Sequence, residues 1–130
     1  MAWPFRRGAS LGQRGESIAR RFCKRAGMKV LARNYRCPAG EIDLIALDRS
    51  TRKTVGAETI VFVEVKTRRS GRYAGPEAAV DARKRRQIRR AADYYLARHD
   101  TEDCNVRFDV VAVVLPEGGK PEVNHIPDAF

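Results

Sequence analysis

Two carboxylates and a lysine lie on two stretches of the chain that have the pattern of neighbouring β-strands. Asp43 lies within residues 40–48 (GEIDLIALD), and Glu64 and Lys66 lie within residues 59–67 (TIVFVEVKT). Alternate residues of a strand share a face, so these charges project from faces otherwise held by large apolar side chains. Charges beside a core need a partner, because removing a charge from water is costly. The pattern therefore predicts a polar site at the margin of a core.

An antiparallel pairing of these strands would bring the two carboxylates together. If Asp48 opposes Thr59, Asp43 falls opposite Glu64, with Cβ atoms about 4.5–5.5 Å apart. A register shifted by two residues would make the pair diagonal, at the same end of the hairpin. Two carboxylates this close repel each other, and a bound divalent cation is the usual way to hold them.

This residue set is suited to metal-assisted cleavage of a phosphodiester. Asp43 and Glu64, together with the carbonyl of Val65, offer the hard oxygen ligands that Mg²⁺ or Mn²⁺ prefers. Such a metal polarises the phosphodiester and lowers the pKa of a bound water. Lys66 can orient or deprotonate that water, or stabilise charge that develops on the phosphate. The alternative is a structural cluster of ion pairs at the edge of the sheet.

The positive charge of the chain is segregated. The net charge is +10, and residues 1–36 hold ten Lys/Arg against one acid, while residues 67–99 hold ten against three. Residues 37–66 carry −1 and residues 100–130 carry −5. Two basic blocks that flank a nearly neutral segment are typical of binding to a phosphate polymer. The alternative is a basic surface with no such partner.

The expected phosphate contacts come from two neighbouring segments. Residues 68–75 form a basic, glycine-rich loop, and six bases follow within residues 83–90 of a predicted helix. At about 100° per residue these six cannot share one face. The residues expected to contact nucleic acid are Arg68, Arg69, Arg72, Lys84, Arg86 and Arg90. The expected partner is nucleic acid, first of all DNA. An RNA-associated protein is an alternative that rests on charge alone, since no aromatic motif typical of RNA-recognition domains supports it.

The elements that must position these residues follow from periodicity and from turn residues. A helix is predicted over residues 10–26, with Glu16 at the edge of its apolar arc and Gly27 as its stop. A second helix is predicted from Pro76 to about His99. Strands are predicted over residues 29–37, 40–48, 59–67, 105–115 and 122–126. This αβββαβ order, with the last strand added, predicts an α/β fold in which helices flank a mixed central sheet.

The length and composition favour one cytoplasmic domain. Residues 1–9 are predicted to be a flexible arm and residues 10–130 one domain. No apolar stretch approaches the roughly 18–20 residues that span a bilayer, so no membrane association is expected. Cys23, Cys37 and Cys104 form an odd, widely spaced set without a CxxC motif, which is typical of reduced thiols in the cytoplasm.

The same residues carry a resemblance to known families. The set Glu16, Asp43, Glu64-Val65-Lys66, on a helix and two strands, resembles the PD-(D/E)xK nuclease superfamily and its restriction-endonuclease-like core, with Ile42 in place of the motif's proline. The segments GEIDLIALD, FVEVKTRRSGRYAGPEAAV, KRRQIRRAADYYL and RFDVVAV, with the closing DAF, look like the YraN-like family of small bacterial proteins. That family is similar to archaeal Holliday junction resolvases.

The resemblance implies a structure-selective endonuclease that cleaves branched or junction DNA with Mg²⁺ or Mn²⁺. It implies metal ligation by Asp43 and Glu64, a catalytic Lys66, and a supporting or ligating role for Glu16. Gln87 is a further supporting candidate, because some related nucleases have a glutamine on this helix. Glu41 shares the face of Asp43, and a plain surface position is its alternative.

Several questions stay open from sequence. A nucleic-acid-binding module that keeps the nuclease fold without cleaving is the competing hypothesis. Pairing of two subunits into a homodimer is also open.

Asp109 is expected to be a structural partner of a basic residue, and His99 and His125 are expected to be isolated, as neither ligands nor bases.

Overall fold

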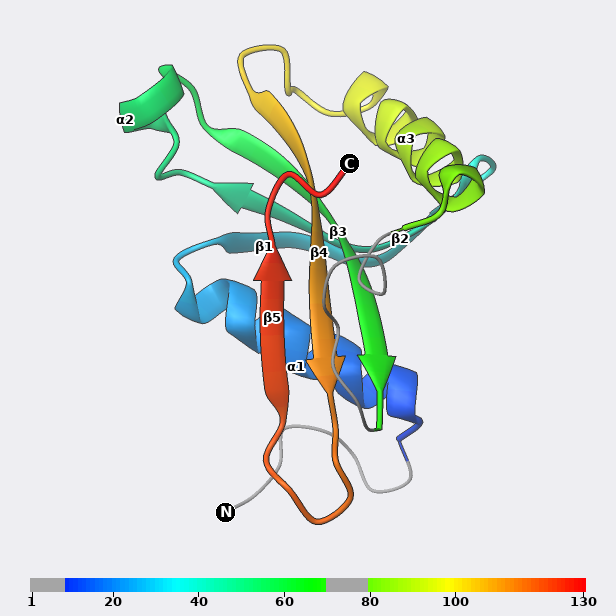
Figure 1. Cartoon of the computed structure of the whole chain (residues 1–130). Helices are drawn as coiled ribbons and strands as arrows, with labels where there is room; N and C mark the ends of the chain where they lie inside the picture. Colours follow the sequence, from blue (N-terminus) through cyan, green and yellow to red (C-terminus); the bar gives the residue numbers. More distant parts are fainter. Residues whose placement is uncertain (1–8, 70–79) are drawn as a thin grey trace.

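A five-stranded sheet carries a long helix on each of its two faces (Figure 1). This computed structural model describes residues 9–69 and 80–130. The helices are α1 (Leu11–Arg25), α2 (Arg52–Val55) and α3 (Ala82–Ala97), and the strands are β1 (Lys29–Cys37), β2 (Gly40–Asp48), β3 (Thr59–Arg68), β4 (Asn105–Val114) and β5 (Glu122–Ile126). The strands lie in sequence order, antiparallel except for the parallel pair β3 and β4. The predicted fold class, a restriction-endonuclease-like α/β domain with a mixed sheet, is confirmed.

The two faces of the sheet bury two separate apolar clusters. Val61 and Val63 of β3 lie in one cluster with Ala19 of α1, whereas Phe62 between them lies in the other with Ile88 of α3. This alternation follows from the period of two in a strand. Helix α1 therefore covers one face and α3 the other. No helix in the described part of the chain is long and apolar enough to span a membrane.

The ends of α1 are set by local side-chain chemistry. The Ser10 hydroxyl accepts a hydrogen bond from the Gln13 amide (3.1 Å), and the Gln13 side chain accepts one from the Ser10 amide (2.9 Å). This reciprocal capping box satisfies two amide groups that a helix start leaves unpaired. At the other end Gly27 has a φ of +89°, a conformation that favours glycine. The helix predicted over residues 10–26 is confirmed to within one residue at each end.

Two predicted elements differ from the structure. The second helix was expected to open at Pro76, but Val80 and Asp81 are not helical and α3 begins at Ala82. The reason is that the Asp81 side chain caps the helix by accepting a hydrogen bond from the Lys84 amide (2.9 Å). Residues 49–58, the polar run between two predicted strands for which no helix was predicted, contain the short helix α2. Residues 1–8 and 70–79, which hold most of the predicted arm and of the basic loop, lie outside the described residues.

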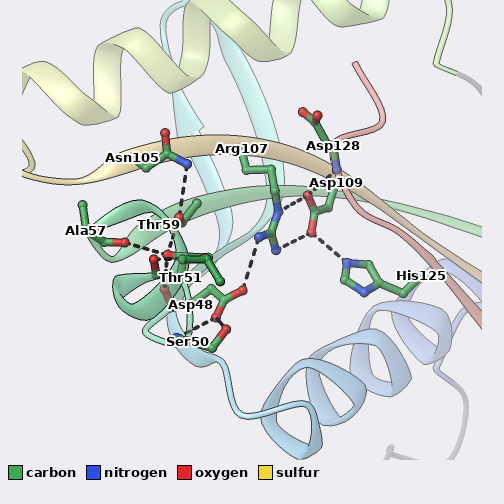
Figure 2. Close-up of polar contacts among 11 residues, drawn as sticks. Asp48, Ser50, Thr51, Ala57, Thr59, Asn105, Arg107, Asp109, His125 and Asp128 are labelled. Atoms are coloured by element: carbon green, nitrogen blue, oxygen red, sulfur yellow. Dashed lines mark hydrogen bonds and ion pairs between the residues drawn. The ribbon is translucent and has the colours of Figure 1, made fainter.

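A buried polar network joins four parts of the chain, and Figure 2 shows it. The fully buried Asp109 accepts two hydrogen bonds from Arg107 (2.8 and 3.0 Å) and one from the Asp128 amide (3.0 Å). His125 Nε2 lies 2.7 Å from the same carboxylate, and Arg107 also reaches Asp48 at 3.2 Å. The expected pairing of Asp109 with a base is confirmed, but the expectation that His125 is isolated is wrong. The network ties β4 to β5, to the end of β2 and to Asp128.

Candidate functional site

The hairpin of β2 and β3 has the register predicted from sequence. Asp48 pairs with Thr59, and the pairing continues to Leu44 and Val63. Asp43 and Glu64 are next in this register, at the point where the regular pairing stops. There the Val65 amide donates a hydrogen bond to Oδ2 of Asp43 (2.8 Å). The side chain of Asp43 thus replaces the backbone as the partner of β3.

Strand β2 bends at Asp43. Leu44 lies in the cluster on the α1 face, but Ile42 and Ile45 both lie in the cluster on the α3 face. Regular alternation would place Ile42 with Leu44, so the pattern reverses around Asp43. The predicted strict alternation of this strand therefore fails at the candidate ligand. Asp43 thus lies where the regular pairing of β2 with β3 ends, and its charge acts on Glu16 of α1 and on Glu64 of β3.

Glu64 is a buried carboxylate with a raised pKa. Its exposed fraction is only 8%. Burial, a side-chain hydrogen bond with Asp43 and the negative charge of Asp43 raise the pKa of Glu64 to about 8. The charges of Lys84 and Lys66 act in the opposite direction, and Lys84 Nζ lies 3.7 Å from Oε2 of Glu64. Asp43 and Glu64 thus share one hydrogen bond, and the positive charges of Lys66 and Lys84 act on Glu64.

Glu16 approaches this pair from α1. It is half-buried, and burial followed by the charges of Asp43 and Glu41 raises the pKa of Glu16. A side-chain hydrogen bond from Asn34 opposes this rise. Glu41 itself is half-buried and pairs with Arg36 at 3.6 Å. The structure therefore brings together Glu16, Asp43 and Glu64, with Glu41 on the outer side.

A close contact between α1 and β3 fixes the position of Glu16. A Cβ atom added to Gly15 would lie 1.9 Å from Oγ1 of Thr67. Only a residue without a side chain permits so close an approach. Gly15 directly precedes Glu16, so the helix can bring this carboxylate near the end of β3.

Asn34 is a site residue that sequence reasoning missed. It lies in β1 between Arg33, which pairs with Leu44, and Tyr35, which pairs with Ile42, so it faces Asp43. Its φ is +49°, a left-handed conformation that asparagine tolerates better than most residues. The only signal in the sequence is the residue type, because the hydrogen bond to Glu16 depends on how α1 packs.

The remaining predicted residues lie along α3 and β3. Gln87 packs against the turn between β1 and β2, since a Cβ added at Gly40 would lie 2.7 Å from Cγ of Gln87. Arg86 and Arg90 are exposed on α3, as is Arg69 after β3. Arg68 is half-buried at the end of β3, and Arg72 lies outside the described residues. Lys84, expected to contact nucleic acid, lies against Glu64.

Two other arginines of α3 are engaged elsewhere. The guanidinium of Arg89 lies 4.7 Å from the ring centroid of Phe108, and that of Arg85 lies 5.9 Å from the centroid of Phe130. The Arg85 side chain also donates a hydrogen bond to the Val80 carbonyl (2.6 Å). The bases of α3 therefore have different partners, as expected for side chains that lie on more than one face of the helix.

The donor chemistry of the site fits a hard divalent cation. Asp43 and Glu64 supply carboxylate oxygens, and the Val65 carbonyl belongs to the edge of β3 that turns toward Asp43. Within residues 9–69 and 80–130, no three carboxylate, imidazole or thiol groups are arranged to enclose an ion. A cation held by two carboxylates would keep several waters, which is the usual mode of Mg²⁺.

Comparison with known proteins assigns the chain to a family. The family model described as "Uncharacterised protein family UPF0102" matches residues 15–113. A UPF0102 protein of Geobacter metallireducens is 46% identical over 121 residues, which cover 93% of this chain and 92% of the relative. Another, from Nocardia farcinica, is 45% identical over 93% of this chain and 89% of its own length. With the helix-borne glutamate, the Asp43 hairpin and the ExK strand in place, this chain belongs to the UPF0102 family, also called the YraN family.

Proposed function

We propose that this protein is a Mg²⁺- or Mn²⁺-dependent endonuclease that hydrolyses phosphodiester bonds of DNA. The observation that supports this most is the shared hydrogen bond of Asp43 and Glu64 beside Lys66 and Lys84. A protein gains nothing in stability from placing a second carboxylate next to a buried one. Carboxylates whose pKa is strongly shifted by burial and by a neighbouring charge cluster at functional sites.

Each residue has a role in the proposal. Asp43 and Glu64 would hold the cation, which when bound supplies a polarised phosphodiester and an acidic water. The Val65 amide fixes Asp43 in its orientation. Lys66 follows Glu64 by two residues on the same face and orients the attacking water or stabilises charge on the phosphate. Glu16, held by Asn34, supports the acidic end of the site.

DNA is the proposed substrate because of the exposed bases of α3. Arg86 and Arg90 are exposed on the same helix that brings Lys84 to Glu64. Phosphate contacts of this kind give affinity without sequence preference. The resemblance to Holliday junction resolvases extends the proposal to branched or junction DNA.

The decisive experiment separates cleavage from binding. Asp43→Asn keeps the size of the side chain but removes its charge. We expect at least about a 100-fold loss of Mn²⁺-dependent cleavage of four-way-junction or flapped DNA. DNA binding should persist or tighten, since one negative charge has left the surface that faces phosphate. The measurement is cleavage on gels beside fluorescence anisotropy with the same labelled DNA.

Arg86→Ala with Arg90→Ala is the matched control. This variant should weaken DNA binding and reduce the dependence of the binding constant on salt, because two phosphate contacts are lost. Cleavage that survives in Asp43→Asn would place the activity elsewhere.

A non-catalytic binding module is the second candidate, and one observation favours it. The ion pair of Lys84 with Glu64 and the hydrogen bond of Glu64 with Asp43 satisfy these side chains without a metal. Wild-type protein that binds DNA but cleaves no linear, flapped or branched substrate with either metal would decide for the module.

A further inference from the structure

Lys84 lies against the most buried carboxylate of the site. Its Nζ lies 3.7 Å from Oε2 of Glu64, where the Glu64 side chain is 10% exposed and the Lys84 side chain is 41% exposed. The lysine therefore reaches the carboxylate from the solvent side. It can leave without opening the core, because its own side chain is already partly in water.

The start of α3 holds Lys84 in this place. Asp81 caps the helix through the Lys84 amide, and the N-cap geometry fixes the direction in which the side chain leaves the first turn. Arg83, one residue earlier, is exposed and leaves the helix about 100° away from Lys84. One base of this turn thus belongs to the acidic cluster, and its neighbour does not.

On the basis of the proposed function, we propose that Lys84 is a displaceable counter-ion of Glu64. The divalent cation takes the place of the Lys84 ammonium, and the released ammonium binds a phosphate of the nucleic acid. Lys84 and a divalent cation neutralise the same negative charge, so their interactions with Glu64 compete. A lysine has a compact charge on a flexible stem and three donors, and this suits it to follow a phosphate oxygen after release.

The exchange couples two binding events. When the cation neutralises Glu64, Lys84 loses its partner beside the position of the scissile phosphate. Metal binding then strengthens phosphate binding through Lys84, and by linkage phosphate strengthens metal binding by the same factor. Lys84 is a residue that couples metal loading to substrate binding.

The first test measures metal binding without nucleic acid. Isothermal titration with Mn²⁺ is compared for wild type, Lys84→Met, Arg83→Met and Asp43→Asn. Methionine keeps an unbranched apolar stem, so both methionine variants lose one positive charge with little change in volume. We expect Mn²⁺ to bind about fivefold more tightly to Lys84→Met, the upper range for a partly exposed ion pair. Arg83→Met should bind Mn²⁺ like wild type, and Asp43→Asn should lose binding.

The outcomes separate this inference from the proposed function. Unchanged or weaker Mn²⁺ binding in Lys84→Met, with normal binding by wild type, overturns the exchange and leaves the metal site intact. Equal tightening in both methionine variants overturns it too, because the effect would then be general electrostatics. No Mn²⁺ binding by wild type overturns the metal site and the exchange together.

The second test measures the coupling. In a Lys66→Ala background, which should not cleave, anisotropy gives the affinity for a labelled junction with and without Mn²⁺. Mn²⁺ should strengthen DNA binding in Lys66→Ala, and this gain should fall about fivefold when Lys84→Met is added. Adding Arg83→Met instead should leave the gain unchanged. A gain that survives in the Lys84 variant contradicts the role of Lys84 in phosphate binding.

Discussion

At the scale of single residues, Asn34 combines two roles that substitutions can separate. Its φ of +49° is costly for most side chains but free for glycine, and its side chain bonds to Glu16. Asn34→Gly should keep the backbone and lose only the hydrogen bond, whereas Asn34→Ala should lose both. We expect the alanine variant to have a free energy of unfolding about 1 kcal/mol lower than the glycine variant. Urea denaturation checks this.

The cleavage rates of the same two variants should not follow their stabilities. Both lose the bond that holds Glu16, so their cleavage rates should fall together if orientation of Glu16 is what matters. A glycine variant as active as wild type would show that Asn34 serves the backbone of β1 alone.

The sequence predicted part of the site at this scale. Asp43, Glu64 and Lys66 could be placed because one opposed pair of an antiparallel hairpin fixes all the others, and the assumed pair of Asp48 with Thr59 is the one observed. Asn34 and the ion pair of Lys84 could not be placed. Both depend on the packing of a helix against the sheet. The position of Lys84 depends also on the cap at Asp81, whereas Pro76 is the stronger helix-start signal in the sequence.

At the scale of elements, α1 contains two glycines that should respond in opposite ways. A Cβ added at Gly12 meets nothing within 4 Å, whereas one added at Gly15 would overlap Thr67. Gly12→Ala should raise the free energy of unfolding by up to about 1 kcal/mol through helix propensity. Gly15→Ala should lower it by about 1–3 kcal/mol, because α1 must move away from β3.

Gly15→Ala should also reduce cleavage, since that movement displaces Glu16. Thermal and urea unfolding of the two alanine variants, with the cleavage assay at a temperature where both remain folded, checks the pair. Equal stability of the two variants would contradict the close packing of α1 on β3.

Elements were the easiest feature to predict. β1, β2 and β5 have the predicted limits, because turn residues and alternation mark both ends of each. The polar run 49–58 gave no periodic signal for the single turn of α2. The link from Asp109 to His125 was missed, because it needs the register of β4 with β5 as well as the strands themselves.

At the scale of the whole molecule, the acidic cluster makes stability depend on pH. The pKa of Glu64 is raised from 4.5 to about 8, so between these values the folded protein binds more protons than the unfolded chain. The free energy of unfolding of metal-free protein should therefore fall as pH rises through this window. The raised pKa of Glu16 acts in the same direction. Asp109, whose pKa is lowered, contributes stability that is lost only at more acidic pH.

Urea unfolding in the presence of a chelator, at about pH 5 and about pH 8, checks this dependence. Glu64→Gln should flatten it, because the titrating group is gone. Mn²⁺ should stabilise the wild type more at the higher pH, where both carboxylates can be charged. Stability that rises over this window would contradict the raised pKa of Glu64.

The buried network of Arg107 also has a consequence for the order in which the protein is made. Glu16, Asp43, Glu64 and Lys66 all precede β4 in the sequence, so a growing polypeptide contains them well before it contains Arg107, Asp109 and Asp128. Until β4 is made, β3 has one unpaired edge and Asp48 at the end of β2 lacks its ion pair with Arg107. Pairing of β4 with β3 across α3 joins distant residues, and such contacts form late. An unfinished chain on the ribosome therefore carries the site's residues on a hairpin whose outer edge is still unpaired.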